Sequence, residues 1–264
     1  MAMIFFEEDD MELRIGDVLS RAFSTWFDHF LAFLVLALVL TLPLLPLELA
    51  PHFMGAESAV WAGAAGAWLR VIVGYLITGV VVYTVFQSLK GESVSVMDSV
   101  TKVSSRLPSI VLAAISVSIM VLVGLLLLCV PGIILSLIFA VVVPVIVVEK
   151  LGVIDGLKRS HELTNGHKVN IFLTYLVYFV ILFAVFFVTA LVTMLLVGGA
   201  GAALDPDALA SGGASNTMVI IASLFDHFTD ALVLPLQATL TTVIYYDLRK
   251  MKDGTDLDEM LAGF

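Results

Sequence analysis

Cysteine and charge are the two features that this chain has least of. Its one cysteine, Cys129, lies in an apolar run. With no second cysteine an intrachain disulfide is excluded, and the setting favours a buried, inert thiol. Only 14% of the 264 residues are charged, whereas 60% are hydrophobic. Because so little polar surface cannot coat a soluble globule, we predict an integral membrane protein.

Basic residues are scarce as well, and this excludes a nucleic-acid partner. The chain has 13 Lys and Arg against 23 Asp and Glu, a formal charge of -10, whereas phosphate binding needs a clustered basic surface. Residues 1–12 carry five acids and no Lys or Arg, so we expect no cleavable secretory leader. No nucleophile elbow, phosphate-cradling loop, paired cysteine ligands or His-Glu-x-x-His string appears. We therefore expect no enzyme, no metal and no cofactor.

Long uncharged runs are what the chain has in abundance. A helix rises about 1.5 Å per residue and the hydrocarbon core of a bilayer is about 30 Å thick, so such runs predict spans. The run at 107–148 is long enough for two spans, and Pro131 with Gly132 predicts a very tight turn between them. Pro144 and Pro235 are expected to kink spans four and six. The predicted spans are 30–47, 71–89, two within 107–148, 171–197 and 219–246, with a Gly- and Ala-rich loop at 198–216.

Six spans place both termini on one side of the membrane, and the basic residues are then distributed unequally between the two sides. Twelve of the 13 Lys and Arg fall on that side and only Arg70 on the other, whereas acids lie on both, 17 and 6. Basic residues near span ends are kept on the cytoplasmic side during insertion. We predict a multi-pass protein of a bacterial-type cytoplasmic (inner) membrane, with both termini and the acidic tails 1–12 and 251–264 in the cytoplasm.

A similar cytoplasmic stretch leads into each pair of spans. Each places an acid four residues before a base, which makes the two neighbours on a helix: Asp17 and Arg21, Asp98 and Lys102, Asp155 and Arg159. In the first stretch apolar residues recur at helical spacing, while Arg14, Asp17, Arg21, Ser24, Thr25 and Asp28 take the other face.

The predicted fold is therefore an all-α integral membrane protein. Its six transmembrane helices form three hairpins, each preceded by an amphipathic helix at the cytoplasmic interface. The units are 13–90, 91–150 and 151–250, within a single membrane domain over 1–264. Two interpretations of the three units stay open: true internal repeats, or three inner-leaflet helices that meet the same requirement.

Several local strings resemble a known membrane domain. They are Val130-Pro131-Gly132-Ile133, Val148-Glu149-Lys150-Leu151-Gly152-Val153-Ile154-Asp155, Lys158-Arg159-Ser160-His161-Glu162-Leu163-Thr164-Asn165-Gly166-His167 and Tyr245-Tyr246-Asp247-Leu248-Arg249. Over residues 120–258 the chain resembles the six-helix membrane domain associated with bacterial glycerophosphoryl diester phosphodiesterases. The resemblance implies a lipid-related setting and carries over no catalytic residue. In fused members the phosphodiesterase activity resides in a soluble barrel of about 250 residues, for which this chain has no room.

Structural roles are assigned to five residues within these strings: Pro131, Gly132, Glu149, Tyr246 and Asp247. Pro131 and Gly132 mark the turn, and Glu149 ends span four. Tyr246 suits the aromatic belt where span six leaves the bilayer. Asp247 is expected to pair locally with Lys250 or Arg249, or to help dock the C-terminal segment against the bundle.

Ionisable residues form two candidate sites. Asp226, His227 and Asp230 lie near the outer end of span six, and Glu48 and His52 follow span one. Such a group inside a span suggests an ion path or substrate contact, and hydration at the outer edge is the alternative; no ligand spacing supports a metal. Six basic residues are candidates to ring the inner mouth and bind lipid phosphates, or simply to set topology: Arg106, Lys150, Lys158, Arg159, Arg249 and Lys250.

The preferred hypothesis is a non-catalytic polytopic membrane module that associates with lipids or binds a partner. That partner would be a membrane protein, a cytoplasmic protein or a second copy of the chain. The alternative is a small transporter or exporter with its pathway between the hairpin units, using the outer Asp226, His227 and Asp230. A polar-lined cavity at mid-membrane would favour transport, whereas a closed apolar bundle with a basic inner rim would favour the first hypothesis.

Overall fold

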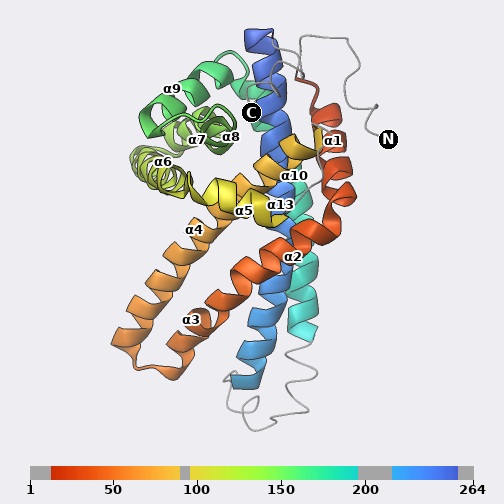
Figure 1. Ribbon diagram of the computed structural model, residues 1–264. Coiled ribbons are helices and arrows are strands. Elements are labelled where there is room, and N and C mark those ends of the chain that lie inside the picture. The colour runs from red at the N-terminus through yellow and green to blue at the C-terminus, as the bar shows by residue number, and fades with distance from the viewer. Residues whose placement is uncertain (1–12, 90–95, 196–215, 255–264) are drawn as a thin grey trace.

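The protein is all-helical over the residues that its computed structural model describes, which are 13–89, 96–195 and 216–254 (Figure 1). No strand occurs in these ranges. The terminal segments 1–12 and 255–264 and most of the predicted loop 198–216 lie outside them. The helices are α1 (Ile15–Asp28), α2 (Phe30–Thr41), η2 (Leu42–Leu44), α3 (Leu45–Leu49), η3 (Ala50–Phe53), α4 (Ala56–Leu89), α5 (Val96–Ser104), α6 (Leu107–Leu127), α7 (Cys129–Ile138), α8 (Val142–Val148), α9 (Val153–Thr164), α10 (Lys168–Leu195) and α13 (Asn216–Asp253).

Six helical segments are long and apolar enough to cross a membrane, as the sequence predicts: Phe30–Leu49, Glu57–Ser88, Leu107–Leu127, Cys129–Val148, Lys168–Leu195 and Val219–Asp253. The second begins at Glu57, well before the predicted start at 71. The reason is that the Ala- and Gly-rich residues before Arg70 continue the helix. α4 therefore has 34 residues and a length of about 51 Å, more than a bilayer core requires.

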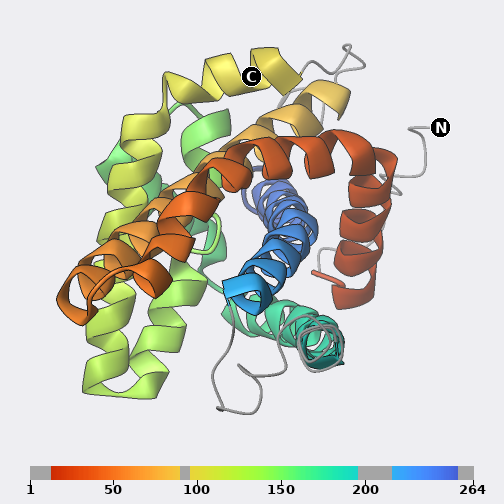
Figure 2. The ribbon, with the colours of Figure 1, turned by 90° about the horizontal axis from the view of Figure 1, so that it is seen from below.

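Helix α13 is the axis of the fold. It contacts α1, α2, α4 and α10, and Figure 2 shows it inside a ring of these helices. Its inward face is apolar and fully buried at Leu240, Ile244, Tyr245 and Leu248. Its buried threonines donate to carbonyls one turn back, as Thr242 does to Ala238 at 2.7 Å. This lets hydroxyl groups enter an apolar core without losing a hydrogen bond.

The tight turn between spans three and four lies at Leu128, and the prediction that Pro131 and Gly132 form it is wrong, because both residues belong to helix α7. Leu128 is extended, with φ -163° and ψ 144°, between the end of α6 and the start of α7. A Cβ on Gly132 would lie 2.4 Å from Leu125 Cγ, and one on Gly124 would lie 2.9 Å from Gly132 Cα. The two helices thus meet at glycines, which allow close backbone approach. Cys129 at this turn is exposed, so the prediction of a buried thiol is wrong.

The α6–α7 hairpin runs crosswise to α10 and α13. Its helices appear nearly end-on in Figure 1 and lengthwise in Figure 2, whereas α10 and α13 show the reverse. In this arrangement the six apolar segments do not form one parallel bundle. The α6–α7 hairpin leads the chain away and back again. The other segments therefore have the same orientation relative to a membrane whether or not the hairpin crosses it.

Span four is interrupted between α7 and α8. Proline at position 144 has no N–H, and its ring would clash with the carbonyl of residue 140 in a continuous helix. The chain turns through Phe139, Ala140 and Val141 before α8 begins. The freed carbonyl of Ile138 accepts hydrogen bonds from Ser160 at 2.8 Å and Thr164 at 3.2 Å. Helix α9 therefore satisfies a carbonyl that the break between α7 and α8 leaves free, since the Val142 N–H bonds Phe139 instead.

Helices α1, α5 and α9 precede the three span pairs, at the predicted positions. In α1 the buried side chains are Val18, Ala22 and Thr25, and this face packs against α13. Thr25 was predicted on the polar face, which is wrong, because its side chain is buried. In α9 the buried Gly156 allows α8 to approach, since a Cβ there would lie 2.8 Å from Ile146 Cγ1.

Candidate functional site

The outer candidate residues gather around Arg70, on α4. Its guanidinium pairs with Asp230 of α13 and lies 3.4 Å from Glu48 Oε2 of α3. His227 Nε2 lies 3.6 Å from the same Glu48 oxygen, and His227 Nδ1 lies 2.8 Å from the Ser223 carbonyl. The structure thus brings together Glu48, His227 and Asp230 of the predicted cluster. We call these three with Arg70 the outer network.

Two further members were predicted. Asp226 lies on the exposed face of α13, close enough to interact electrostatically with Arg70, Asp230 and His227. His52 lies in η3, but its side chain is outside what the structure describes. Arg70 is the member that the sequence-based prediction missed, although it is the one basic residue predicted on the outer side. Among the described residues no group of three His, Cys, Asp or Glu side chains could hold a metal.

A second network lies at the other end of α13. Arg159 Nε donates to both Glu149 oxygens, at 3.0 and 3.3 Å, and Arg159 Nη2 donates to Asp253. The Tyr245 hydroxyl donates to Glu149 Oε1 at 3.0 Å and accepts from Arg249 Nη1 at 3.0 Å. We call these five residues the inner network. It ties α9 and the end of span four to the last two turns of α13.

The charge on Arg159 is stabilised by its partners. Burial alone would lower its pKa, but the hydrogen bond to Asp253 and the charges of Glu149 and Asp253 outweigh burial and raise it. Arg159 and Arg249 were both candidate phosphate contacts, and both are instead bonded within the protein. The structure places the other four candidates as follows: Arg106 is half-buried before α6, Lys150 is exposed at φ 56°, Lys158 is exposed on α9 and Lys250 is half-buried on α13.

A separate clasp joins the first helix to the last. Arg21 Nη1 donates to Asp247 Oδ1 at 2.9 Å, and Nη2 donates to Oδ2. This bidentate pairing holds α1 against α13 across 226 residues of sequence. Arg21 and Asp247 were expected to pair locally, within their own helices. Asp247 had also been expected to help dock the C-terminal segment against the bundle, and this contact agrees with that expectation.

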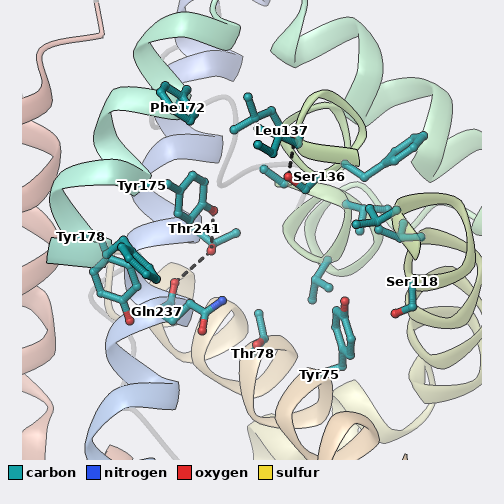
Figure 3. Close-up of a pocket in the computed structure, with 18 of the residues that line it drawn as sticks. Tyr75, Thr78, Ser118, Ser136, Leu137, Phe172, Tyr175, Tyr178, Gln237 and Thr241 are labelled. Atoms are coloured by element: carbon teal, nitrogen blue, oxygen red, sulfur yellow. Dashed lines mark hydrogen bonds between the residues drawn. The ribbon is translucent and has the colours of Figure 1, made fainter. Parts of the chain in front are cut away.

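A cavity of about 630 Å³ lies between α4, the α6–α8 segment, α10 and α13 (Figure 3). Pockets of about 300–1,000 Å³ are typical of small-ligand sites. The lining is apolar, with hydroxyl groups and one amide among the apolar side chains, and none of the lining residues is charged. Its polar members are Tyr75, Thr78, Ser118, Ser136, Tyr175, Tyr178, Gln237 and Thr241.

Helices of all three predicted units contribute to this cavity: α4 from the first, α6 to α8 from the second, and α10 and α13 from the third. The Tyr175 hydroxyl lies 3.2 Å from Thr241 Oγ1, and the Ser136 hydroxyl donates to the Ile133 carbonyl at 2.7 Å. No residue of either network lines it. The described helices therefore do not form a closed apolar bundle, and the cavity is distinct from both candidate sites of the sequence.

Comparison with known proteins yields one match. A family described as a domain of unknown function, DUF7847, matches residues 64–248, which include most of α4 and all of the cavity lining. No curated protein and no solved structure matches the chain.

Proposed function

Since the chain belongs to the DUF7847 family, whose description assigns no function, we propose one from the geometry: a non-catalytic membrane module that holds a lipid between its helices. The observation that carries this proposal is the uncharged cavity of about 630 Å³. It is bordered by helices that are apolar enough to lie in a bilayer, so lipid is the most abundant molecule that reaches it.

The chemistry of the lining supports a binding role over a catalytic one. Proton transfer in enzymes relies on His, Asp, Glu, Lys, Cys or Tyr held near the reacting group. Of these types the lining has only tyrosines, and Tyr175 and Tyr178 contact polar atoms of α13. Ion pairs that join one helix to another lie instead in the two networks and in the Arg21–Asp247 clasp.

Six crossings with both termini in the cytoplasm are part of the proposal. Helix α6 and the α7–α8 segment are 21 and 20 residues long and carry no charge, which is enough for one bilayer crossing each. We therefore propose that this hairpin also crosses, although it runs crosswise to α10 and α13. Helices α1, α5 and α9 would then lie at the inner interface, in a bacterial-type inner membrane. The resemblance to the membrane domain associated with glycerophosphoryl diester phosphodiesterases belongs to the same proposal, and it would give the lipid-related setting.

Filling the cavity tests the proposal. Ser136 lines it, whereas Ser116 on α6 does not, and each hydroxyl donates to a carbonyl of its own helix. Lipids retained by the purified full chain would be measured by native mass spectrometry. Ser136→Phe should abolish retention of the bound lipid and Ser116→Phe should preserve it. Equal retention by both variants, or no lipid on the wild-type protein, would contradict the proposal.

A transporter or exporter is the second candidate, because the cavity borders all three units, where such a pathway would lie. It would not use the outer network, since none of those residues lines the cavity. In a Cys129→Ser background, Thr241→Cys distinguishes the two functions. A pathway makes this cysteine reactive toward a membrane-impermeant maleimide from both sides of the membrane, whereas a lipid-holding module shields it from at least one side.

A partner-binding role remains the other form of the first hypothesis. Helix α10 exposes large apolar side chains, among them Phe179, Phe183 and Phe187. In a bilayer, lipid tails cover such a face as well as a protein would. The face therefore favours no particular partner, and the partner-binding form rests on the sequence alone.

A further inference from the structure

Gln237 is the one amide that faces the cavity. Its neighbours along α13, Pro235, Leu236, Ala238 and Thr239, are all buried, whereas Gln237 itself is exposed. Figure 3 shows its side chain pointing into the cavity, on the same side as Thr78. Within the described residues its side-chain amide has no hydrogen-bond partner, although its backbone carbonyl accepts from Thr241 at 2.9 Å.

The depth of Gln237 makes an unpartnered amide costly. It lies nine residues before Tyr246, which is about 14 Å along the helix. If Tyr246 marks the inner boundary, Gln237 is near the middle of a hydrocarbon core of about 30 Å. A polar group at that depth is retained where a protein group, water or a ligand bonds it. An amide with two donors and one acceptor oxygen thus lies where a ligand oxygen would satisfy it.

The rest of the lining selects against a charged headgroup. The other polar groups of the lining are hydroxyls. Those of Thr241 and Tyr175 are bonded to each other, and that of Tyr75 interacts with Ser118 on the far wall. A phosphate taken into this space would lose its hydration with no cation to compensate for the loss. A hydroxyl or an ester carbonyl would lose far less and would bond the amide.

The route into the cavity is apolar. Ile133 on α7 and Phe172 and Phe179 on α10 are lining residues that are also exposed. They form a rim where the hydrocarbon tail of a bound molecule would leave the cavity between these two helices. A molecule with a small neutral head and long tails fits both the rim and the interior.

We infer that the cavity is a binding site for a neutral glycerolipid, whose hydroxyl or ester oxygen is bonded by the Gln237 side chain. The inference rests on the proposed function and deepens it by naming the lipid class. Charged lipids of the same chain length would bind the outside of the protein and not this site.

Competition among lipids with identical tails tests the inference. The detergent-solubilised full chain is mixed with dioleoylglycerol, dioleoyl phosphatidic acid and dioleoyl phosphatidylglycerol, and bound lipid is counted by native mass spectrometry. The wild-type protein should retain dioleoylglycerol in preference to both anionic lipids. Gln237→Leu should lower its affinity for dioleoylglycerol about three- to tenfold, the effect of one hydrogen bond. Thr189→Val, which removes a hydroxyl on α10 outside the cavity, should leave it unchanged.

Thermal unfolding of the lipid-free protein separates this effect from misfolding. Gln237→Leu removes an unpartnered amide, so the apo variant should unfold at the same or a higher temperature than the wild type while binding less dioleoylglycerol. Equal dioleoylglycerol affinity in Gln237→Leu and wild type, or a preference for phosphatidic acid, would overturn the inference and leave the lipid-holding function standing. Retention of none of the three lipids, and of no native lipid, would overturn both.

Discussion

Arg159 connects three segments of the fold, so its replacement by methionine should destabilise the protein strongly. The side chains of Arg159, Glu149 and Asp253 are 22%, 14% and 28% exposed. Methionine keeps the length and apolar stem but removes the cation shared by Glu149 and Asp253, and Asp253 keeps only its longer ion pair with Arg249, at 3.7 Å. Removing one partner of a fully buried pair costs about 3–5 kcal/mol. Partial exposure screens these charges, and we expect Arg159→Met to lower the free energy of unfolding by about 2–3 kcal/mol.

Two companion variants show whether the geometry or the charge is responsible. Arg159→Lys keeps the charge but cannot reach both carboxylates with a planar fork, so it should recover only part of the loss. In Arg159→Met, the further change Asp253→Asn should restore some stability, because it removes one of the two carboxylates that have lost their bond to Arg159. Lys158→Met is the matched control. Lys158 is exposed on the same helix, and its replacement should change stability by less than about 0.5 kcal/mol.

Reversible unfolding in mixed micelles, followed by circular dichroism, measures these differences. The free energy of unfolding should fall in the order wild type, Arg159→Lys, Arg159→Met. If Arg159→Met were as stable as Lys158→Met, the inner network would contribute nothing to the fold. Arg159 would then be free to serve as the lipid-phosphate contact that the sequence suggested.

An impermeant maleimide should label Cys129 on intact cells, because it lies at the exposed tip of the hairpin; labelling only after membranes are opened would refute crossing. Gly132→Ala should destabilise by about 1–3 kcal/mol through overpacking, whereas Gly16→Ala, with open space around it, should not. Arg70→Met should lower thermal stability by unpairing two carboxylates and leave dioleoylglycerol retention unchanged. The pKa of His167 is lowered by burial and, to a smaller extent, by the charge of Lys252. Because the unfolded chain then binds the proton more strongly, stability should fall as pH drops below about 6.5. His167→Asn should remove this pH dependence in thermal melts.

The helices could be predicted from the sequence because their signal is local. An uncharged run has few stable forms other than a buried or membrane helix, and six such segments appear where the runs are. The tight turn was predicted three residues too late, because a Pro-Gly pair is typical of turns, whereas here Pro131 lies in the first turn of α7 and Gly132 allows α6 and α7 to approach closely. The start of α4 was predicted too late because Arg70 interrupts the uncharged run. In the structure Arg70 is paired with Glu48 and Asp230, and the helix continues through it.

The ion pairs could not be predicted, because their partners are distant in sequence. Spacing of four residues suggested that Asp17 pairs with Arg21, but a helix pair of that kind contributes only about 0.2–0.5 kcal/mol. A bidentate bond to Asp247 in a partly buried setting is stronger, so the guanidinium takes it. The same competition directs Arg159 toward Asp253, 94 residues away. Pattern alone cannot rank a local partner against one that only the fold supplies.

The cavity was missed for a different reason. Its lining comes from several helices that are separate in sequence, and its polar groups are hydroxyls that any span tolerates. Gln237 was the signal available, because an amide in the middle of a predicted span is unusual there. The sequence interpretation counted ionisable groups alone, and these lie at the two ends of α13.

The position of charge along α13 has a mechanical consequence. Asp230 and Asp253 are 23 residues apart, about 35 Å of helix, and each is held by an arginine of another helix. Between them, the wall of the cavity carries only neutral groups whose contacts are weak and individually replaceable. Opening the cavity to admit a lipid therefore breaks no ion pair, whereas separating α4 or α9 from α13 breaks at least one. Movements of α10, which contacts α13, α7 and α1 and belongs to neither network, are the least costly way to open it.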